Sequence, residues 1–190
     1  FLGYTESDWI QLLDEWGYKK FHAGQIMKWI HHRFISDFSE MSDIGKNLRE
    51  HLSMTGNLKE PRVKKEFVST DGTRKWLIES FSGKLFELVY IPEKSRGTLC
   101  GSSQVGCALK CDFCSNGKLG FINNLTAAEI VAQIRIAIRR LAEIFPENKK
   151  RSVSNIVFMG MGEPLLNLPN VLPALDVIRS DLGYGISKRR

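Results

Sequence analysis

Three cysteines lie close together in the sequence, in the pattern C-x3-C-x2-C, at Cys107, Cys111 and Cys114. Thiolates at this spacing can ligate three irons of a [4Fe-4S] cube from one short loop, which leaves the fourth iron open. An open iron can chelate a small molecule such as S-adenosylmethionine, whereas a cluster with four protein ligands carries electrons or stabilises structure. The pattern therefore predicts a catalytic iron–sulfur cluster.

Structural zinc is the alternative interpretation of these cysteines, with Cys100 as the fourth ligand. Zinc-ribbon and bacterial ferredoxin motifs repeat C-x2-C, so the longer first gap in this chain argues against both. Zinc would also leave unexplained the glycine-rich run and the alternation of strands and helices described below. Four cysteines in a chain of 190 residues without a secretory leader favour metal or redox chemistry over structural disulfides.

A second run that can do chemistry is Gly-Met-Gly-Glu-Pro at residues 160–164, directly after a predicted strand. Glycines let the backbone approach a ligand closely, and a carboxylate such as Glu163 accepts hydrogen bonds from an ammonium group. Glycine turns after strands are common, so the run alone is a weak signal. Its position downstream of the cysteine pattern strengthens it.

Apolar residues recur at helical spacing in the first 60 residues. They predict one helix that ends at Gly17, a second around residues 26–30, and a third over residues 44–52 with Ser42 as its cap. The apolar positions are Trp9, Leu12, Leu13, Trp16, Ile26, Ile30, Ile44, Leu48 and Leu52. Trp29, His31, His32 and Arg33 are either core residues or contacts to a nucleic acid.

The period then changes to that of strands. Residues 63–69 and 75–81 flank Asp71-Gly72, which predicts a β-hairpin, and a third strand covers residues 85–91 before Pro92. These strands form an antiparallel extension at residues 61–96.

From Gly97 onward the predicted order is strand, loop, helix, strand, loop, helix. The strands are residues 97–103 and 153–159; Thr126 and Glu129 form a capping box for the first helix, and the second helix runs over 169–182 and stops at Gly183. Ile186 is predicted to begin a further strand. This alternation predicts right-handed βαβ units of a barrel-like α/β fold at residues 97–190, with chemistry on the loops after the strands.

Composition agrees with a globular protein that has a polyanionic partner. The chain is 43% hydrophobic and 25% charged, with a formal net charge of +6, which suits phosphates. No apolar stretch is long enough to span a bilayer and no leader is visible, so we expect a cytoplasmic protein.

Four stretches of the sequence resemble the RlmN family of dual-specificity RNA adenine methyltransferases, in the radical-SAM superfamily. They are TLCGSSQVGCALKCDFCS at residues 98–115, FMGMGEPLLN at 158–167, KFHAGQIMKWI at 20–30 and DGTRKWL at 71–77. The resemblance implies an N-terminal part of a radical-SAM (β/α) barrel, preceded by a helical RNA-binding domain at residues 1–60. Related enzymes that methylate carbon 8 carry Ala where this chain has Pro164, so carbon 2 of adenine is favoured.

The same resemblance implies roles for particular residues. Phe113 walls the adenine of S-adenosylmethionine, and Gly162 and Glu163 hold its methionine end. Glu87 is the proton acceptor, and Cys100 releases a covalent RNA adduct by forming a disulfide with a methyl-carrying cysteine. From the residues alone, Glu87 is equally an ordinary strand carboxylate and Cys100 an inert buried thiol.

Further expectations follow from the family. The substrates are large-subunit ribosomal RNA and transfer RNA, the reductant is an electron donor such as flavodoxin, and the intact enzyme is a monomer. No cysteine follows Cys114, so the chain resembles the first half of such an enzyme, and we expect it to be inactive and prone to self-association by itself. The alternatives are a carbon-8 methyltransferase and a non-catalytic iron–sulfur or zinc module that binds RNA.

Overall fold

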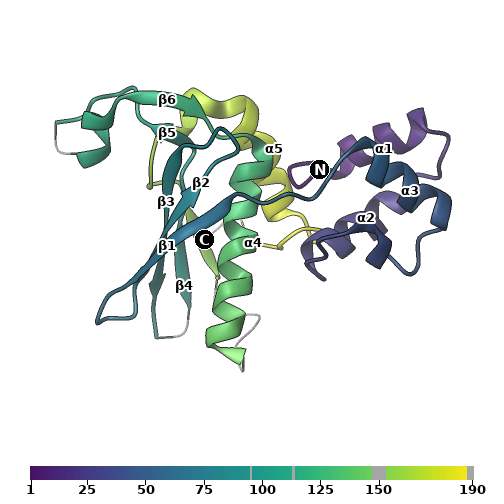
Figure 1. Cartoon of the computed structure of the whole chain (residues 1–190), viewed down its shortest axis with the longest axis horizontal. Helices are drawn as coiled ribbons and strands as arrows, with labels where there is room; N and C mark the ends of the chain where they lie inside the picture. The colour runs from purple at the N-terminus through teal and green to yellow at the C-terminus, as the bar shows by residue number, and fades with distance from the viewer. Residues whose placement is uncertain (95, 113, 147–152, 188–190) are drawn as a thin grey trace.

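The computed structural model describes all residues except 95, 113, 147–152 and 188–190. The N-terminal helices lie on one side of the molecule, and a sheet with the long helix α4 against it forms the other side (Figure 1). None of the helices in the described part of the chain is long and apolar enough to cross a membrane.

The N-terminal region contains the three predicted helices. They are α1 (Glu6–Glu15), α2 (His22–His31) and α3 (Lys46–Thr55), with a short 3-10 turn η1 (Phe38–Glu40) between the last two. A reciprocal capping box formed by Thr5 and Asp8 starts α1. The prediction for α3 was wrong at its start, because Gly45 is the N-cap and Ile44 is buried ahead of the helix.

Of the four residues predicted to be either core residues or contacts to a nucleic acid, two lie in the core of this region. Trp29 is buried and its indole Nε1 donates a hydrogen bond to Asp43 Oδ1 at 2.5 Å, and His31 is also buried. His32 and Arg33 are exposed, and the Arg33 guanidinium lies 3.8 Å from the centroid of the Trp29 ring. The core interpretation is therefore confirmed for Trp29 and His31.

Five strands form one mixed sheet in the order β1-β2-β3-β4-β7. Their bounds are β1 (Arg62–Val68), β2 (Arg74–Glu79), β3 (Leu85–Pro92), β4 (Gly97–Cys100) and β7 (Asn155–Val157). The predicted hairpin is confirmed: β1 and β2 are antiparallel, Gly72 has a φ of +84°, and Asp71 Oδ1 accepts the Thr73 N–H at 2.9 Å. The first three strands thus continue directly into the strands of the βαβ unit.

The predicted βαβ unit is also present. Strands β4 and β7 are parallel, and α4 (Ala127–Ile144), which begins with the Thr126–Glu129 capping box, connects them. The last helix, α5 (Leu168–Arg179), is preceded by the 3-10 turn η4 (Pro164–Asn167). It ends at Arg179 with Ser180 as its C-cap, before the predicted stop at Gly183.

The strand predicted at Ile186 is wrong for the described residues. Residues 185–187 have no regular structure, and the Ile186 N–H donates to the Ile178 carbonyl at the end of α5 instead. The described strands include one parallel pair and show no closed barrel, so the observed architecture is an α/β fold with N-terminal helices and a mixed sheet. The segment bounds at residues 60 and 96 stay predictions.

The two faces of the sheet differ in what covers them. One face packs on α4 and α5 through a buried apolar set, which includes Trp76, Ile78, Phe86, Leu88 and Leu99. Side chains alternate along a strand, so the intervening residues point to the opposite face. That face carries half-buried side chains that include Lys75, Glu87 and Cys100, and we call it the open face of the sheet.

Arg135 of α4 ties the N-terminal helices to the sheet region. It is 0% exposed, its guanidinium donates to the Ile30 and Ile35 carbonyls, and it forms an ion pair with Glu60. Arg139, one turn later, pairs with the same carboxylate at 3.1 Å. A buried charge with three partners is costly to leave half-paired, so this contact fixes how the two regions meet.

Replacing this arginine tests the contact. Arg135→Met should lower the free energy of unfolding by about 3–5 kcal/mol, because it leaves two buried carbonyls without their donor and removes one of the two cations that pair with Glu60. Arg139→Met is the matched control, since its side chain is 45% exposed and it contacts the same Glu60; its cost should stay below about 1 kcal/mol. Urea unfolding measures both, and equal losses would contradict this account.

His31 gives a pH-dependent prediction for the same interface. Burial, aided by the Arg135 charge, lowers the pKa of His31 to about 3. Protonation therefore favours the unfolded chain, and stability present above about pH 6.5 is lost as the pH falls toward 3. Between pH 7 and 5, the chain should lose about 2 kcal/mol more than the His31→Gln variant. Identical pH profiles in urea unfolding would show that His31 is not buried and neutral.

Candidate metal and cofactor site

The cysteine loop connects the two strands of a small hairpin that the sequence analysis did not predict. Strands β5 (Gln104–Gly106) and β6 (Phe121–Asn124) pair, and the loop leaves from Gly106 and returns through Gly120. Both glycines have positive φ, +72° and +71°, and a Cβ on Gly106 would lie 1.8 Å from the Gly120 carbonyl oxygen. Only glycine fits this neck, and the Cys107 N–H closes it by donating to Gly120 O at 3.0 Å.

Inside the loop, the three cysteines stand on a tightly folded backbone. Cys107 is buried, Cys111 and Cys114 are half-buried, and the Cys114 N–H donates to Cys111 O at 3.0 Å. Gly117 of η2 (Ser115–Leu119) packs beneath them, because a Cβ there would lie 2.9 Å from Cys111 O. Backbone contacts thus fix the base of the loop and the turn that carries Cys111 and Cys114.

All four cysteines are free thiols, and a hollow of about 480 Å³ opens beside Cys111. Within the described ranges, no three acidic, histidine or cysteine side chains are gathered closely enough to hold a metal ion. The donor set, three free thiols on one loop, fits three-thiolate ligation of a cube, in which each thiolate binds a different iron. Cys100 is a free thiol in this chain, which does not contain the cysteine expected to pair with it, and Phe113 lies outside the described residues.

The glycine-rich loop after β7 packs onto the chain that leads from β4 to β5. Gly160 N–H donates to Gly101 O at 3.0 Å, and Met161 O accepts the backbone N–H groups of Ser103 and Gln104. Gly162 has a φ of +92°, and a Cβ there would lie 2.4 Å from Gln104 Cβ. The close approach expected of these glycines is thus used, at least in part, within the protein.

Glu163 is half-buried and caps the following turn. Its Oε1 accepts the Leu165 N–H at 3.0 Å, and its own N–H donates to Gln104 Oε1 at 3.0 Å. Asn116 of the cysteine loop donates to Gly160 O at 3.3 Å. The two motifs therefore contact one another, and Gln104 and Asn116, which sequence analysis missed, carry these contacts.

Ser102 is the buried junction of this site, with 0% of its surface exposed. Its Oγ donates to the Glu87 carbonyl at 2.6 Å and accepts the Met161 N–H at 2.8 Å. Its backbone N–H and C=O are both paired with the side-chain amide of Gln133 on α4, each at 2.8 Å. One serine thus joins β3, α4 and the glycine-rich loop.

Glu87 and Cys100 lie on the open face of the sheet, on adjacent strands. Val89 pairs with Cys100 in the antiparallel register, and Glu87 is two residues from Val89, so the three side chains share a face. The Glu87 carboxylate accepts from Lys75 Nζ at 3.0 Å. Burial raises the pKa of the Cys100 thiol, while a hydrogen bond from the Met159 backbone acts in the opposite direction. The thiol form is therefore favoured at neutral pH.

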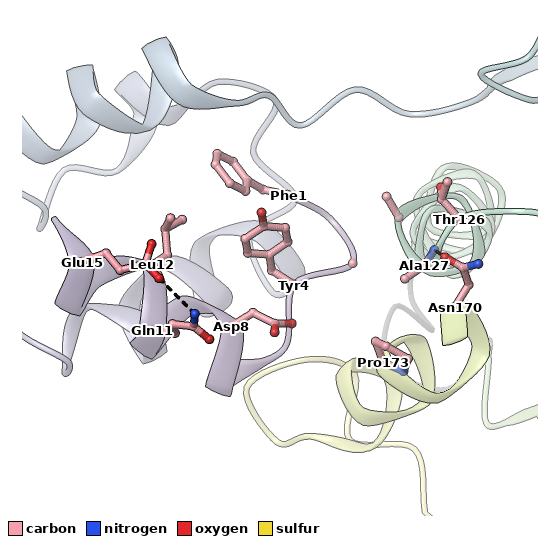
Figure 2. Close-up of a pocket in the computed structure, with 12 residues that line it drawn as sticks. Phe1, Tyr4, Asp8, Gln11, Leu12, Glu15, Thr126, Ala127, Asn170 and Pro173 are labelled. Carbon is pink, nitrogen blue, oxygen red and sulfur yellow. Dashed lines mark hydrogen bonds between the residues drawn. The ribbon is translucent and has the colours of Figure 1, made fainter. Parts of the chain in front are cut away.

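The hollow shown in Figure 2 lies apart from these motifs. Its volume is about 530 Å³, and it lies between α1 and the first turns of α4 and α5. Asp8 and Glu15 contribute carboxylates to it, and Gln11 Nε2 donates to Glu15 Oε1 at 3.0 Å. No cysteine lines it, so its size does not make it the site of the chemistry.

Comparison with known proteins agrees with this geometry. Residues 1–57 match the model of the ribosomal RNA large subunit methyltransferase N-terminal domain. A solved radical SAM methyltransferase from Sphaerobacter thermophilus superposes with a TM-score of 0.87 at 33% identity, over 100% of this chain and 55% of that one. The fold of this chain, with its cysteine loop, is thus that of the matched part of a radical SAM methyltransferase.

The similar curated proteins belong to one family. The chain is 52% identical, over 189 residues, to the dual-specificity RNA methyltransferase RlmN of Pseudomonas putida and 51% identical to that of Pseudomonas entomophila. These matches cover 100% of this chain but 49% and 50% of the relatives. The chain belongs to the RlmN family and corresponds to its N-terminal half, so it spans about half the length of the curated relatives it matches.

The packing of the glycine-rich loop can be tested through its glycines. Gly162→Ala should cost about 2–3 kcal/mol of unfolding free energy, because the added methyl meets Gln104 and the positive φ is strained. Gly24→Ala in α2 is the control: its Cβ would lie 3.7 Å from Leu182, and alanine should stabilise the helix by up to about 1 kcal/mol. Thermal unfolding compares the two, and a neutral Gly162→Ala would refute the close approach.

Proposed function

We propose that the protein to which this chain belongs is a radical S-adenosylmethionine methyltransferase that methylates carbon 2 of adenine in large-subunit ribosomal RNA and in transfer RNA. The observation that carries the proposal is the 52% identity to RlmN over 100% of the chain, with both motifs in contact through Asn116 and Gly160. The β4-α4-β7-α5 segment would be the first part of a (β/α) barrel.

Cys107, Cys111 and Cys114 would hold the [4Fe-4S] cluster. The spacing, the free thiols and the glycine neck support this assignment. A cluster bound there would supply one-electron reduction chemistry toward S-adenosylmethionine. The remaining residues act by holding substrates and moving protons.

Gly162 and Glu163 would hold the methionine end of S-adenosylmethionine, and Phe113 would wall its adenine. The Glu163 Oε1 already accepts the Leu165 N–H, which fixes the carboxylate at the mouth of the loop. An ammonium group is a suitable donor to such a fixed carboxylate, because charge-assisted hydrogen bonds are the stronger kind.

Glu87 would accept the proton from carbon 2 of adenine, and Cys100 would release the methylated RNA by forming a disulfide with a methyl-carrying cysteine of the full-length protein. Their shared position on the open face of the sheet supports this pairing of roles. The ion pair with Lys75 holds the Glu87 carboxylate in one place on that face.

Ribosomal and transfer RNA are the proposed partners, and the formal charge of +6 suits them. An electron donor such as flavodoxin would supply the electron, and we propose a cytoplasmic enzyme that acts as a monomer. The helical region at residues 1–60 would contribute to RNA binding through its exposed cations, not through the buried Trp29 and His31.

Metal and sulfide analysis tests the cluster assignment. The chain reconstituted anaerobically with iron and sulfide should bind about four irons and four sulfides, as a three-thiolate cube requires. Cys111→Ala should abolish the cluster, while Cys100→Ala, outside the triplet, should keep it. Stoichiometric zinc without sulfide, lost in Cys100→Ala, would replace this proposal with a structural zinc site.

The reaction itself is tested in the full-length protein. Mass spectrometry after incubation with reductant, S-adenosylmethionine and RNA should find deoxyadenosine and 2-methyladenosine, and Glu87→Gln should abolish the second product. Formation of 8-methyladenosine would assign the other carbon, and no deoxyadenosine would point to a non-catalytic RNA-binding module.

A further inference from the structure

Phe67 is an apolar residue that the proposed chemistry does not use and that the fold does not bury. It lies near the end of β1 and is 43% exposed. Two ammonium groups lie near its ring: Lys65 Nζ is 4.8 Å and Lys75 Nζ is 5.5 Å from the ring centroid. Exposed aromatic rings flanked by cations are typical of surfaces that bind single-stranded nucleic acid.

The register places Phe67 on the open face of the sheet, together with the proposed catalytic residues. Phe67 pairs with Lys75 across β1 and β2, and Lys75 pairs with Val89 of β3, which pairs with Cys100 of β4. Paired residues project to the same face, so one row of side chains runs from the outer strand to the cysteine.

Lys75 connects the two ends of this row. Its Nζ lies 3.0 Å from Glu87 Oε1 and 5.5 Å from the Phe67 ring centroid. Two strand spacings and a shift of two residues put the Phe67 and Glu87 backbones about 12 Å apart, within reach of neighbouring nucleotides on one strand.

The charges around Phe67 favour a polyanion on this face. The nearest carboxylate on β1, Glu66, points to the covered face, where it pairs with Arg74 at 2.7 Å and Arg140 at 3.7 Å. Lys75 is neutralised by Glu87, so Lys65 supplies the cation that remains free to meet a phosphate. RNA complements both groups, because a base can stack on the ring while the adjoining phosphate meets the lysine.

We propose that Phe67 is a stacking platform for a base of single-stranded RNA that flanks the target adenine, with Lys65 contacting the adjoining phosphate. This rests on the proposed function, because it takes RNA as the substrate and the open face as the reacting side. Every base has a π-face, so the contact adds affinity without reading sequence. Its part is to hold the strand while the target adenine lies near Glu87.

The test measures RNA binding to the full-length protein, with a fluorescein-labelled single-stranded RNA oligonucleotide that contains adenine and fluorescence anisotropy as the readout. Phe67→Ala should weaken binding about tenfold, and Phe67→Trp should keep or increase affinity. Phe81→Ala is the matched control, because Phe81 is 52% exposed but precedes β3 at the far turn of the β2-β3 hairpin, and it should have no effect.

The phosphate contact is tested by the salt dependence. Lys65→Ala should reduce the slope of log K against log salt by about 0.7, as expected for one phosphate on a single strand. Lys64→Ala is its control, because Lys64 is paired with Glu79 at 3.5 Å, and the slope should change less. Circular dichroism checks that each variant is folded.

The outcomes separate this inference from the proposed function. If the unchanged chain binds RNA and Phe67→Ala binds equally well, the platform is refuted while RNA stays the partner. If the unchanged chain binds no RNA, RNA is refuted as the partner and the platform is refuted with it. If Phe67→Ala lowers the melting temperature but leaves the RNA affinity unchanged, the ring packs within the protein and stabilises its fold, and the platform is wrong.

Discussion

The arrangement of the site depends on the hydrogen bonds of one buried hydroxyl group, that of Ser102. It accepts from the glycine-rich loop and donates to the strand that carries Glu87, and the same residue's backbone is held by Gln133 of α4. An unpaired polar group at 0% exposure would be costly, so these partners keep their places together. The segment that follows Ser102 leads directly into the hairpin of the cysteine loop, and that loop inherits its position from this junction.

Local signals in the sequence predicted most of the fold. The Thr126–Glu129 capping box and the Asp71-Gly72 turn act within a few residues, so their structures follow from chemistry that is visible in one short window. Hairpin β5-β6 was missed because its strands are short and the cysteine loop separates them, so the sequence has no alternating pattern to detect. The end of α5 and the residues after it depend on tertiary contacts, such as the Ile186–Ile178 hydrogen bond.

The candidate site divides in the same way. The cysteine spacing and the glycine-rich run predict that two loops form the site, and the fold brings these loops into contact through Asn116. The sequence could not reveal that Gly162 packs on Gln104, or that Lys75 pairs with Glu87, since such pairs join separate elements. Arg135 is a similar case: a charged residue on an apolar helix would ordinarily be assigned to solvent, and its partners lie far away in the sequence.

The glycine neck of the cysteine loop determines where the first thiol lies. Gly106 and Gly120 close the base of the loop by backbone geometry and a backbone hydrogen bond, with no contribution from the thiols. The base of the loop is thus held by backbone contacts and not by the proposed ligand atoms. A change at Gly106 or Gly120 would therefore displace Cys107 while leaving all three thiols in the sequence, so the ability to hold a cluster depends on two glycines as well as on the cysteines.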